Sequence, residues 1–392
     1  MPTPKILIVD DEPFNVDYLE QELEDLDYET ITAGNGQEAL DKIQSDSPDL
    51  VLLDIMMPVM DGFEVLTRIK SNPALRDIPV IVISADNNLQ SVVKGIQIGA
   101  EDYMPKPFEP VLLHARISSS LEKKRLRDIQ QLYLKSLERE LDIAREIQQG
   151  FLPSQLPEVS GWEIAAYFKA AREVAGDFYD AFLLPNGSLV CVVGDVCGKG
   201  VGAALFMTLF RSLIRATFLM ERFIQMEALE SLTPAAHLQH VVDFTNHYIS
   251  DTHGDANMFA TVFIGVFNLQ DGTLTYINCG NDPPLVVAKG GVLKSLPPTG
   301  PVIGILPDAR FAVKEVSLAR DELLLAFTDG IPDTLNANNA SFGNARLREL
   351  LPKDEMVSAP TLLKTIETHL HDFIGAANQF DDITILAVHR YA

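Results

Sequence analysis

Short apolar runs that alternate with helix-period segments constrain the fold of this chain more than any other feature. Three such runs, residues 6–9, 50–53 and 80–83, have the length and composition of buried strands. Segments with apolar residues at helical spacing separate them, so residues 1–118 consist of repeated strand and helix units. Such units predict an α/β doubly wound parallel sheet, whose ligands bind at the carboxyl ends of the strands.

Polar side chains stand at those strand ends. Asp10 and Asp11 follow the first run, Asp54 follows the second, Ser84 follows the third, and Lys106 lies after a further run. Because three carboxylates at one rim repel one another, we expect a hard divalent cation such as Mg²⁺ to neutralise them. A carboxylate held beside the cation and Lys106 can act as nucleophile toward a phosphoryl donor, and we expect Asp54 to fill this role.

The strings VDDE, LLDIMMPVMDG, VIVISA and DYMPKPF resemble the receiver domain of two-component response regulators over residues 1–118. The resemblance implies that Asp54 is the phosphoacceptor and that a sensor histidine kinase or a phosphotransfer protein supplies the phosphoryl group. It also implies that Asp11 and the Met56 carbonyl bind Mg²⁺, with Asp10 acting partly through water.

By the same resemblance, Ser84 and Lys106 contact the phosphoryl group, and Tyr103 is the switch aromatic residue of the domain. The Lys106–Pro107 peptide is expected to be cis, an isomer that proline makes accessible at low cost. The alternative is an inert receiver that serves as a docking module, although no residue needed for phosphorylation is missing.

Residues 119–152 are the expected connection to a second domain. From Leu121 to Leu152 there is neither proline nor a strand pattern, and apolar residues recur three or four positions apart, which predicts a long amphipathic helix. The heptad rhythm is interrupted near Tyr133 to Leu141. Two interpretations remain open, a helix that packs on its own domains and a parallel, coiled-coil-like seam between two copies of the chain. The length of the segment favours the homodimer.

Residues 153–392 differ in pattern, because strand-like runs separated by glycine, proline and Asn-Gly turns are interrupted by two helical blocks. We expect a separate α+β domain of antiparallel sheets packed with helices. The apolar stretch from Val201 to Met220 carries Arg211 and Arg215 in its middle. Charges at that depth predict a buried helix of a soluble domain rather than a membrane span.

The overall charge excludes several classes of partner. The 392 residues carry a formal charge of −24, so the averaged field repels nucleic acid and anionic membranes. A DNA-binding response regulator is also disfavoured because no basic recognition helix is visible. The three cysteines show no close spacing, and the first residues lack the apolar core of a signal peptide, so we expect a cytoplasmic protein.

Four acidic motifs at the ends of predicted strands in the second domain contain Asp177, Asp195, Asp329 and Asp381. Singly, an aspartate before glycine is most often a turn residue. Together, a set of carboxylates without histidine suits Mg²⁺ or Mn²⁺ better than zinc. Two such ions would activate a bridging water for in-line attack at phosphorus, so no protein nucleophile is required.

The strings REVAGDFYD, VGDVCGKGVGAALFM, MFATVFIGVF, FTDGI and DDITILAV resemble bacterial metal-dependent serine/threonine phosphatases of type 2C, in the branch that controls sigma factors. The resemblance covers about residues 150–392. Such phosphatases typically dephosphorylate a small anti-sigma-factor antagonist protein, which is the implied substrate. The implied ligands of two Mn²⁺ or Mg²⁺ ions are Asp195 as the bridge, Asp177 with the Val196 carbonyl at one ion, and Asp329 with Asp381 at the other.

The sequence departs from that family at Cys279 to Pro284, where CGNDPP replaces a string closer to Gly-His-Asn-Pro-Pro, and at Ala175, which replaces a glycine. Neither departure touches an expected metal ligand. Lys199 and Arg172 are candidate contacts for the substrate phosphate, because a cation near the metals helps to hold a dianion. The alternative is that either residue is simply solvated.

Two complete sites joined by one helix predict a signalling enzyme in which phosphorylation of Asp54 controls a phosphoserine or phosphothreonine phosphatase. The alternative is a non-catalytic adaptor that binds a sigma factor or its antagonist through a degenerate phosphatase fold. An adaptor is expected to have lost metal-binding aspartates, whereas all four candidates are present: Asp177, Asp195, Asp329 and Asp381.

Overall fold

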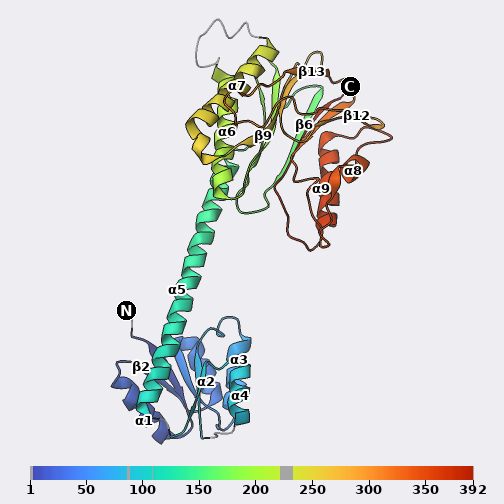
Figure 1. The fold of residues 1–392 in the computed structure, drawn as a ribbon. Coiled ribbons are helices and arrows are strands. Elements are labelled where there is room, and N and C mark those ends of the chain that lie inside the picture. Colours follow the sequence, from blue (N-terminus) through green and yellow to red (C-terminus); the bar gives the residue numbers. More distant parts are fainter. Residues whose placement is uncertain (1–2, 86–88, 108, 221–232, 392) are drawn as a thin grey trace. The chain divides into compact units, whose positions relative to one another are not determined.

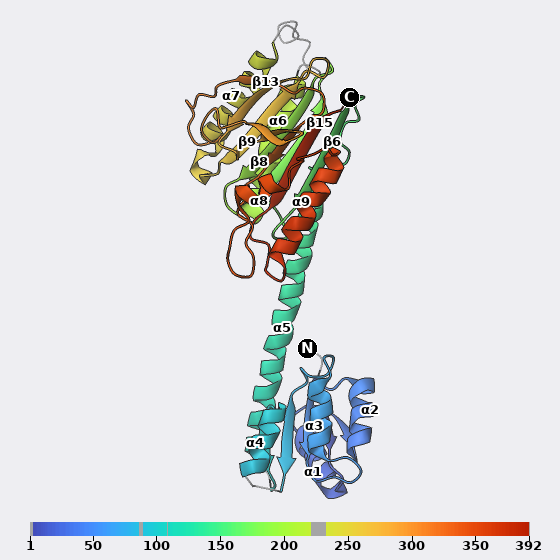
Figure 2. The same cartoon turned by 90° about the vertical axis from the view of Figure 1, so that its right-hand side faces the viewer.

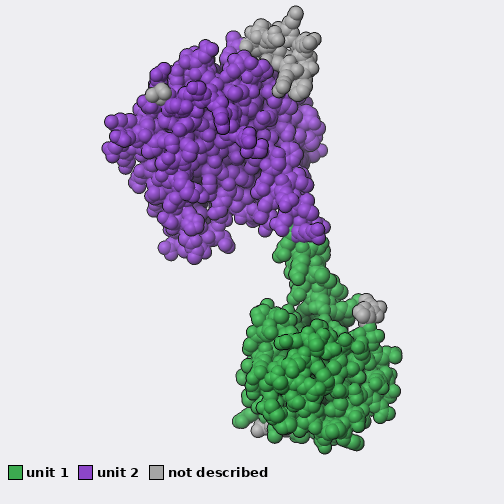
Figure 3. All heavy atoms as spheres, turned by 180° about the vertical axis from the view of Figure 1, so that it is seen from behind, with its two compact units in different colours: residues 1–138 green, residues 139–392 purple. Residues whose placement is uncertain are grey.

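The computed structural model describes residues 3–85, 89–107, 109–220 and 233–391. The chain divides into two compact units, residues 1–138 and 139–392, which Figure 3 shows in different colours. Each unit has hydrophobic cores of its own.

The first unit, whose sheet is drawn in shades of blue in Figure 1, is built on a five-stranded parallel sheet. The strand order is β2-β1-β3-β4-β5. Every residue of β3 and β4 is buried, as expected for central strands of a sheet that is covered on both faces. The predicted doubly wound parallel sheet is therefore confirmed. Its strands are β1 (Lys5–Val9), β2 (Glu29–Ala33), β3 (Leu50–Asp54), β4 (Val80–Ser84) and β5 (Asp102–Pro105).

Helices cover both faces of this sheet. Leu19 and Leu113 pack in the core on one face, whereas Ile43 and Ile69 pack in the core on the other. Asp61 is the N-cap residue of the helix that begins at Gly62, because its side chain accepts a hydrogen bond from the backbone N–H of Glu64 in the first turn. The helices are α1 (Pro13–Glu24), α2 (Gly36–Asp46), α3 (Gly62–Ser71), α4 (Leu89–Ile98) and α5 (Pro110–Gln149).

Helix α5 runs from Pro110 to Gln149 without a break. The last helix of the receiver and the linker helix that the sequence predicts from Leu121 onward are therefore a single element. Large apolar side chains three or four positions apart remain exposed along its middle. This exposed apolar stripe of α5 consists of Leu126, Ile129, Tyr133 and Leu137.

The second unit contains two antiparallel five-stranded sheets, with the strand orders β13-β10-β9-β8-β7 and β12-β11-β14-β15-β6. The strands of the first sheet are β7 (Asp177–Leu183), β8 (Leu189–Val196), β9 (Ala260–Phe267), β10 (Thr273–Cys279) and β13 (Lys314–Ser317). Those of the second are β6 (Trp162–Lys169), β11 (Leu285–Ala288), β12 (Gly291–Ser295), β14 (Glu322–Phe327) and β15 (Ile383–Arg390).

The two sheets pack face to face, and helices cover their outer faces (Figure 2). Phe263 and Leu324 lie in the core between the sheets, Phe210 packs on the outer face of the first sheet, and Ile366 packs on that of the second. The predicted α+β domain of antiparallel sheets and helices is confirmed. Its helices are α6 (Val201–Leu219), α7 (Pro234–His253), the short η2 (Gly254–Ala256), α8 (Gly343–Glu349) and α9 (Ala359–Ile374).

Helix α6 is, among the residues that the structure describes, the one helix long and apolar enough by length and composition to cross a membrane. It packs against α7, β7 and β8. Its Arg211 and Arg215 bind the buried carboxylate of Asp180 on β7, at 2.9 Å and 2.7 Å. Apolar packing and a buried ion pair thus hold α6 within this unit, in line with the buried helix that the sequence predicts.

Candidate functional site

Three carboxylates of the first unit meet at the carboxyl ends of β1 and β3, which are neighbours in the parallel sheet. Oxygen atoms of Asp10, Asp11 and Asp54 all lie within 4.8 Å of one another. The Nζ atom of Lys106, just after β5, lies 2.7 Å from Oδ2 of Asp10 and 2.7 Å from Oδ1 of Asp54. The structure therefore brings together the four charged residues that the sequence selects.

Asp54 is buried beside one positively charged group, the ammonium of Lys106. Its side chain is buried, and its Oδ2 accepts a hydrogen bond from the backbone N–H of Met56 at 2.8 Å. Burial raises the pKa of Asp54, although Lys106 opposes this effect. Burial also disfavours the charged form of Lys106, but Asp10 and Asp54 outweigh it and raise the pKa of the ammonium. A charged lysine is thus held where a phosphoryl group on Asp54 would need a counter-charge.

The remaining receiver residues lie around this centre. Ser84 ends β4 and is fully buried, and its carbonyl oxygen accepts a hydrogen bond from the backbone N–H of Lys106 at 2.8 Å. Tyr103 on β5 is buried in the core that α2 and α3 cover. The Lys106–Pro107 peptide is cis, as predicted. Metal binding by the Met56 carbonyl and the switch role of Tyr103 stay predictions.

The second site begins with a pair of aspartates on neighbouring strands. Asp177, the first residue of β7, is the antiparallel register partner of Asp195 near the end of β8, so their side chains are direct cross-strand neighbours. Asp177 is buried, and its Oδ2 accepts a hydrogen bond from the Thr328 hydroxyl at 2.7 Å. Because Thr328 follows β14 of the other sheet, the two sheets meet at this pair.

Asp329 and Asp381 reach the same region from the second sheet. Asp329 follows the end of β14 and Asp381 precedes β15, and these two strands pair with each other. Gly330 permits the close approach of the two segments, since a Cβ atom there would collide with the carbonyl oxygen of Asp382. The four predicted aspartates, which lie far apart in the sequence, thus gather at one end of the two sheets and form the acidic cluster.

Mutual repulsion and burial make the acidic cluster unfavourable in its fully ionised form. Burial, with Asp195 and Asp382 nearby, raises the pKa of Asp177 well above its usual value. Burial, together with Asp329 and other carboxylates, raises the pKa of Asp195 to about 7. Partial burial, with Asp381 as its strongest neighbour, raises the pKa of Asp329 to about 6. These carboxyl groups therefore keep their protons to a higher pH than an ordinary aspartate, and a bound cation would oppose this effect.

The donor atoms of the acidic cluster suit hard divalent cations, which prefer carboxylate and carbonyl oxygens. A Cβ atom on Gly176 would lie 2.8 Å from the carbonyl oxygen of Val196 and 3.3 Å from Oδ1 of Asp195, so the absent side chain leaves these two donors facing one space. A bound Mg²⁺ or Mn²⁺ pair would neutralise the carboxylates and lower the pKa of a bound water. The residues that would hold the ions are Asp177, Asp195, Val196 through its carbonyl, Asp329 and Asp381.

The two predicted phosphate contacts occupy different positions. The Nζ atom of Lys199 lies 2.8 Å from Oδ2 of Asp381 and donates to the carbonyl oxygen of Phe380 at 2.9 Å. Arg172 is exposed on the loop between β6 and β7, where it lines a cavity of about 270 Å³. The structure thus places Lys199 in the acidic cluster and Arg172 on a loop beside it, and phosphate binding by either stays a prediction.

Three aspartates join the acidic cluster without having been selected from the sequence. Asp382 accepts hydrogen bonds from the backbone N–H groups of Ala171 at 2.7 Å and Gly176 at 2.8 Å. Asp282 and Asp333 contribute to the raised pKa of Asp329. The adjacent pair Asp381-Asp382 in the DDITILAV string could have indicated that Asp382 belongs to the site. Nothing in the sequence indicated Asp333, which lies outside the strings that resemble the phosphatases.

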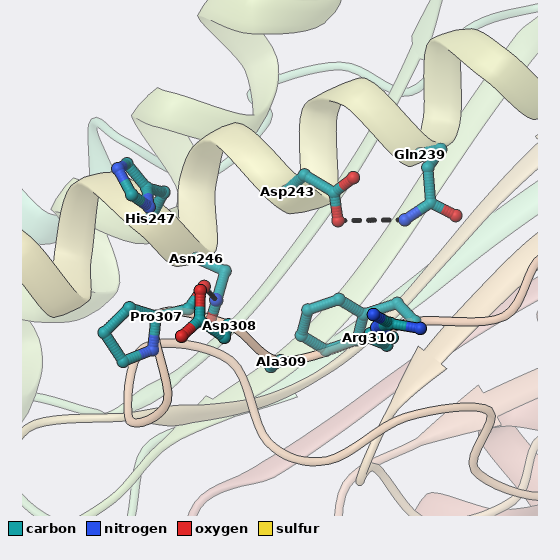
Figure 4. A pocket seen from close by; sticks show the side chains of 9 residues that line it. Gln239, Asp243, Asn246, His247, Pro307, Asp308, Ala309 and Arg310 are labelled. Carbon is teal, nitrogen blue, oxygen red and sulfur yellow. Dashed lines mark hydrogen bonds between the residues drawn. The ribbon is translucent and has the colours of Figure 1, made fainter.

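A further groove, of about 800 Å³, lies between α7 and residues 307–311 (Figure 4). Gln239 donates a hydrogen bond to Asp243 at 2.9 Å along its helical wall. Asn246 holds the other wall by donating to the carbonyl oxygens of Leu306 at 2.8 Å and Pro307 at 3.2 Å. None of the acidic-cluster aspartates lines this groove, so it is not part of the site described above.

The fold and the two sites define a receiver domain followed by a type-2C-like phosphatase domain. Residues 6–118 match the family model of the response regulator receiver domain. Residues 185–391, more than half of the chain, match the family model of stage II sporulation protein E, SpoIIE, and the chain belongs to this family. The domain is therefore of a protein phosphatase family, whose fold and divalent-metal chemistry agree with the acidic cluster.

Individual relatives match part of the chain. The Protein IcfG of Synechocystis is 40% identical over 264 residues, which are 64% of this chain and 41% of that protein. The alkaline phosphatase synthesis transcriptional regulatory protein PhoP of Bacillus subtilis is 40% identical over 119 residues, 30% of this chain and 49% of that protein. The chain thus spans less than half the length of each. The solved SiaA-PP2C domain of Pseudomonas aeruginosa shares the fold, with a TM-score of 0.54 and 24% identity over 66% of this chain and 99% of that one.

Proposed function

We propose that this chain is a metal-dependent protein serine/threonine phosphatase whose activity is controlled by phosphorylation of Asp54. The observation that carries the proposal is the convergence of Asp177, Asp195, Asp329 and Asp381 at one end of the two sheets, where burial, together with neighbouring carboxylates, raises the pKa of Asp195 to about 7. An adaptor that only binds a partner has no need of such an unfavourable cluster of charge. An enzyme that binds divalent cations, in contrast, requires such a cluster of carboxylates.

The chain's own residues would prepare the site for a phosphate ester. The Thr328 hydroxyl donates a hydrogen bond to Oδ2 of Asp177 and so orients this carboxyl group. Gly176 keeps space open beside the Val196 carbonyl and Asp195. Lys199 brings a positive charge to the cluster, where a phosphate dianion could use it. These arrangements support hydrolysis without a covalent intermediate on the protein.

The receiver supports the regulatory half of the proposal. Lys106 holds two carboxylates, and the Asp54 carboxylate lies among groups that could bind Mg²⁺ and stabilise an added phosphoryl group. The phosphoryl donor would be a sensor histidine kinase or a phosphotransfer protein. The substrate would be the phosphorylated antagonist of an anti-sigma factor, as in the resembling branch of phosphatases. We also propose that the protein acts in the cytoplasm, without nucleic acid or membrane as a partner.

The exposed apolar stripe of α5 supports a homodimer. Leu126, Ile129, Tyr133 and Leu137 lie three or four positions apart, and each side chain is more than a third exposed. Burial of such a stripe against a second copy of the same helix would remove apolar surface from water, as in a parallel coiled coil. In such a dimer, two receiver domains would jointly regulate two phosphatase domains.

The test is Mn²⁺-dependent hydrolysis of a generic phosphate ester by the full chain, with and without beryllofluoride as the phosphoryl mimic on Asp54. The wild type should turn over, and Asp195→Asn should lose at least about a hundredfold in rate, since a bridging ligand would be removed. Beryllofluoride should change the wild-type rate and leave that of Asp54→Asn unchanged. Absence of turnover in every state, with a phosphoprotein substrate as well, would favour the adaptor.

A further inference from the structure

The loop between β6 and β7 lacks regular secondary structure but leads directly into the acidic cluster. It comprises residues 170–176, and the next residue is Asp177. Val174 and Ala175 are buried, so the polar groups of this backbone cannot rely on water. Side chains from elsewhere in the chain must therefore satisfy and order this loop.

One of these side chains belongs to the last residues of α5. The Gln148 side chain is buried, its Oε1 accepts a hydrogen bond from the backbone N–H of Ala175 at 3.0 Å, and its Nε2 donates to the carbonyl oxygen of Ala175 at 2.7 Å. Both backbone polar groups of the fully buried residue Ala175 are thus held by one amide side chain. Arg145, one turn earlier, adds a hydrogen bond from Nε to the carbonyl oxygen of Glu173 at 2.9 Å.

The acidic cluster holds the same loop from the other side. Asp382 accepts from the N–H groups of Ala171 and Gly176, at 2.7 Å and 2.8 Å. Ala175, which Gln148 holds, and Gly176, which Asp382 holds, are adjacent. Gly176 is also the position where an added Cβ would fill the space beside Val196 and Asp195. Displacement of Ala175 would therefore move the peptide that borders the predicted metal ligands.

We propose that Gln148 is a positioning residue, through which the end of α5 sets the geometry of the acidic cluster. This inference deepens the proposed function, and its regulatory consequence rests on that function. Helix α5 begins at Pro110 in the first unit and ends at Gln149 in the second, so both units contribute residues to one element. Successive residues of a helix are about 100° apart, so a small rotation of its end would turn the Gln148 amide away from Ala175.

The loop has room to respond to such a rotation. A cavity of about 270 Å³ lies beside the Gln148 contact, lined by residues of α5 and of the loop. Its walls include Arg145 and Gln149 from α5, and Lys169 and Glu173 from the loop and its start. The loop can therefore move toward this space without first displacing packed side chains.

The chain offers a matched pair of variants, because Gln149 is exposed and stands next to the buried Gln148. Gln148→Met keeps the length of the side chain and removes both hydrogen bonds, whereas Gln149→Met makes the same chemical change on the surface. We expect Gln148→Met to speed hydrogen–deuterium exchange of the amides at 175–177 by about tenfold or more, as the loss of two hydrogen bonds implies. Exchange in the 184–188 turn should not change.

Two kinetic readouts separate positioning from a purely structural role. In the full chain, Gln148→Met should lower kcat for a generic phosphate ester by about tenfold with little change in KM, and it should abolish the response to beryllofluoride. Gln148→Glu keeps the acceptor for the Ala175 N–H but loses the donor, so it should recover part of the exchange protection. Arg145→Met, a change at an exposed residue, should shift exchange at 173–175 in the same direction by a smaller factor.

The inference is overturned if Gln148→Met and Gln149→Met show the same exchange at Gly176 and the same response to beryllofluoride. It is also overturned if exchange rises throughout the phosphatase unit while kcat stays at the wild-type value. If Gln148→Met does not fold, exchange at Gly176 and the response to beryllofluoride are compared instead between the wild type, Gln148→Glu and Arg145→Met, and the absence of any difference overturns the inference. A wild type without turnover would defeat the proposed function, whereas exchange at Gly176 would still decide whether Gln148 positions the loop.

Discussion

The Nζ atom of Lys199 lies 2.8 Å from Oδ2 of Asp381 and 4.7 Å from the centre of the Phe380 ring. Lys199 therefore forms an ion pair with one carboxylate oxygen of Asp381, which is a predicted metal ligand. Gly198 and Gly200, on either side of it, both have positive φ values, 90° and 79°, a backbone conformation that glycine adopts without strain. The loop that carries Lys199 is thus shaped to direct this cation at the acidic cluster.

Removal of this lysine should strengthen metal binding. In Lys199→Met, Asp381 loses a competing cation, and we expect the Kd for Mn²⁺ to fall about two- to fivefold, the range of a partly exposed ion pair. Titration calorimetry measures this, with the receiver site disabled by Asp11→Asn in both proteins. Lys294→Met, an exposed lysine on β12, is the control. An unchanged or weaker affinity in Lys199→Met would contradict the competition.

The metal-free phosphatase unit should lose stability as the pH rises. Burial and neighbouring carboxylates raise the pKa of Asp195 to about 7 and that of Asp329 to about 6, and the pKa of Asp177 is also raised. An aspartate in the unfolded chain has a pKa of about 3.9. Between these values the folded state binds more protons than the unfolded state, so the free energy of unfolding falls with increasing pH. In EDTA, the Tm of this unit should be lower at about pH 8 than at about pH 5.5.

Metal and mutation provide the controls for that trend. Mn²⁺ should raise the Tm more at about pH 8 than at about pH 5.5, because it competes with protons for the same oxygens. Asp195→Asn removes one of the shifted groups and should flatten the pH dependence in EDTA. Differential scanning fluorimetry measures both effects. A Tm that rises with pH in EDTA would show that the clustered carboxylates do not govern stability.

Phosphorylation of the receiver should require Asp54 and depend on Lys106. Asp54→Asn should incorporate no phosphoryl group from a small-molecule donor, because the nucleophilic carboxylate is gone. Lys106→Met keeps the nucleophile but loses the cation that lies 2.7 Å from both Asp10 and Asp54, so phosphorylation should slow by about tenfold or more. Phosphate-affinity electrophoresis measures the incorporation. Asp41→Asn, on the exposed face of α2, should behave as the wild type.

The oligomeric state should depend on the apolar stripe of α5. Tyr133→Asp places a charge in the stripe, whereas Gln131→Asp makes the same change of charge elsewhere on the helix. Both residues are exposed in the single chain, so neither change should unfold it. Light scattering after size-exclusion chromatography should show a dimer for the wild type and Gln131→Asp, and a monomer for Tyr133→Asp. A wild type that is monomeric with and without beryllofluoride would remove the dimer from the proposal.

Local pattern was enough to locate the receiver site. In a parallel sheet the carboxyl ends of neighbouring strands share one edge, so the positions of Asp10, Asp54 and Lys106 after predicted strands imply that they meet. In the antiparallel second unit, motifs at the ends of predicted strands selected Asp177 and Asp195, and the family resemblance implied their role as metal ligands. Local pattern could not find the role of Asp382, whose two hydrogen bonds go to residues 171 and 176, more than two hundred positions away.

The sequence by itself determined the two fold classes, the family resemblance and the chemical character of both sites, since these depend on short-range periodicity and on motifs of a few residues. Only the tertiary structure decided that α5 is continuous from Pro110 to Gln149, that Lys199 pairs with Asp381, and that Gln148 holds Ala175. These contacts join segments far apart in the chain. Their energy comes from packing and from the satisfaction of buried polar groups, and no local pattern of residues encodes which distant partner will satisfy them.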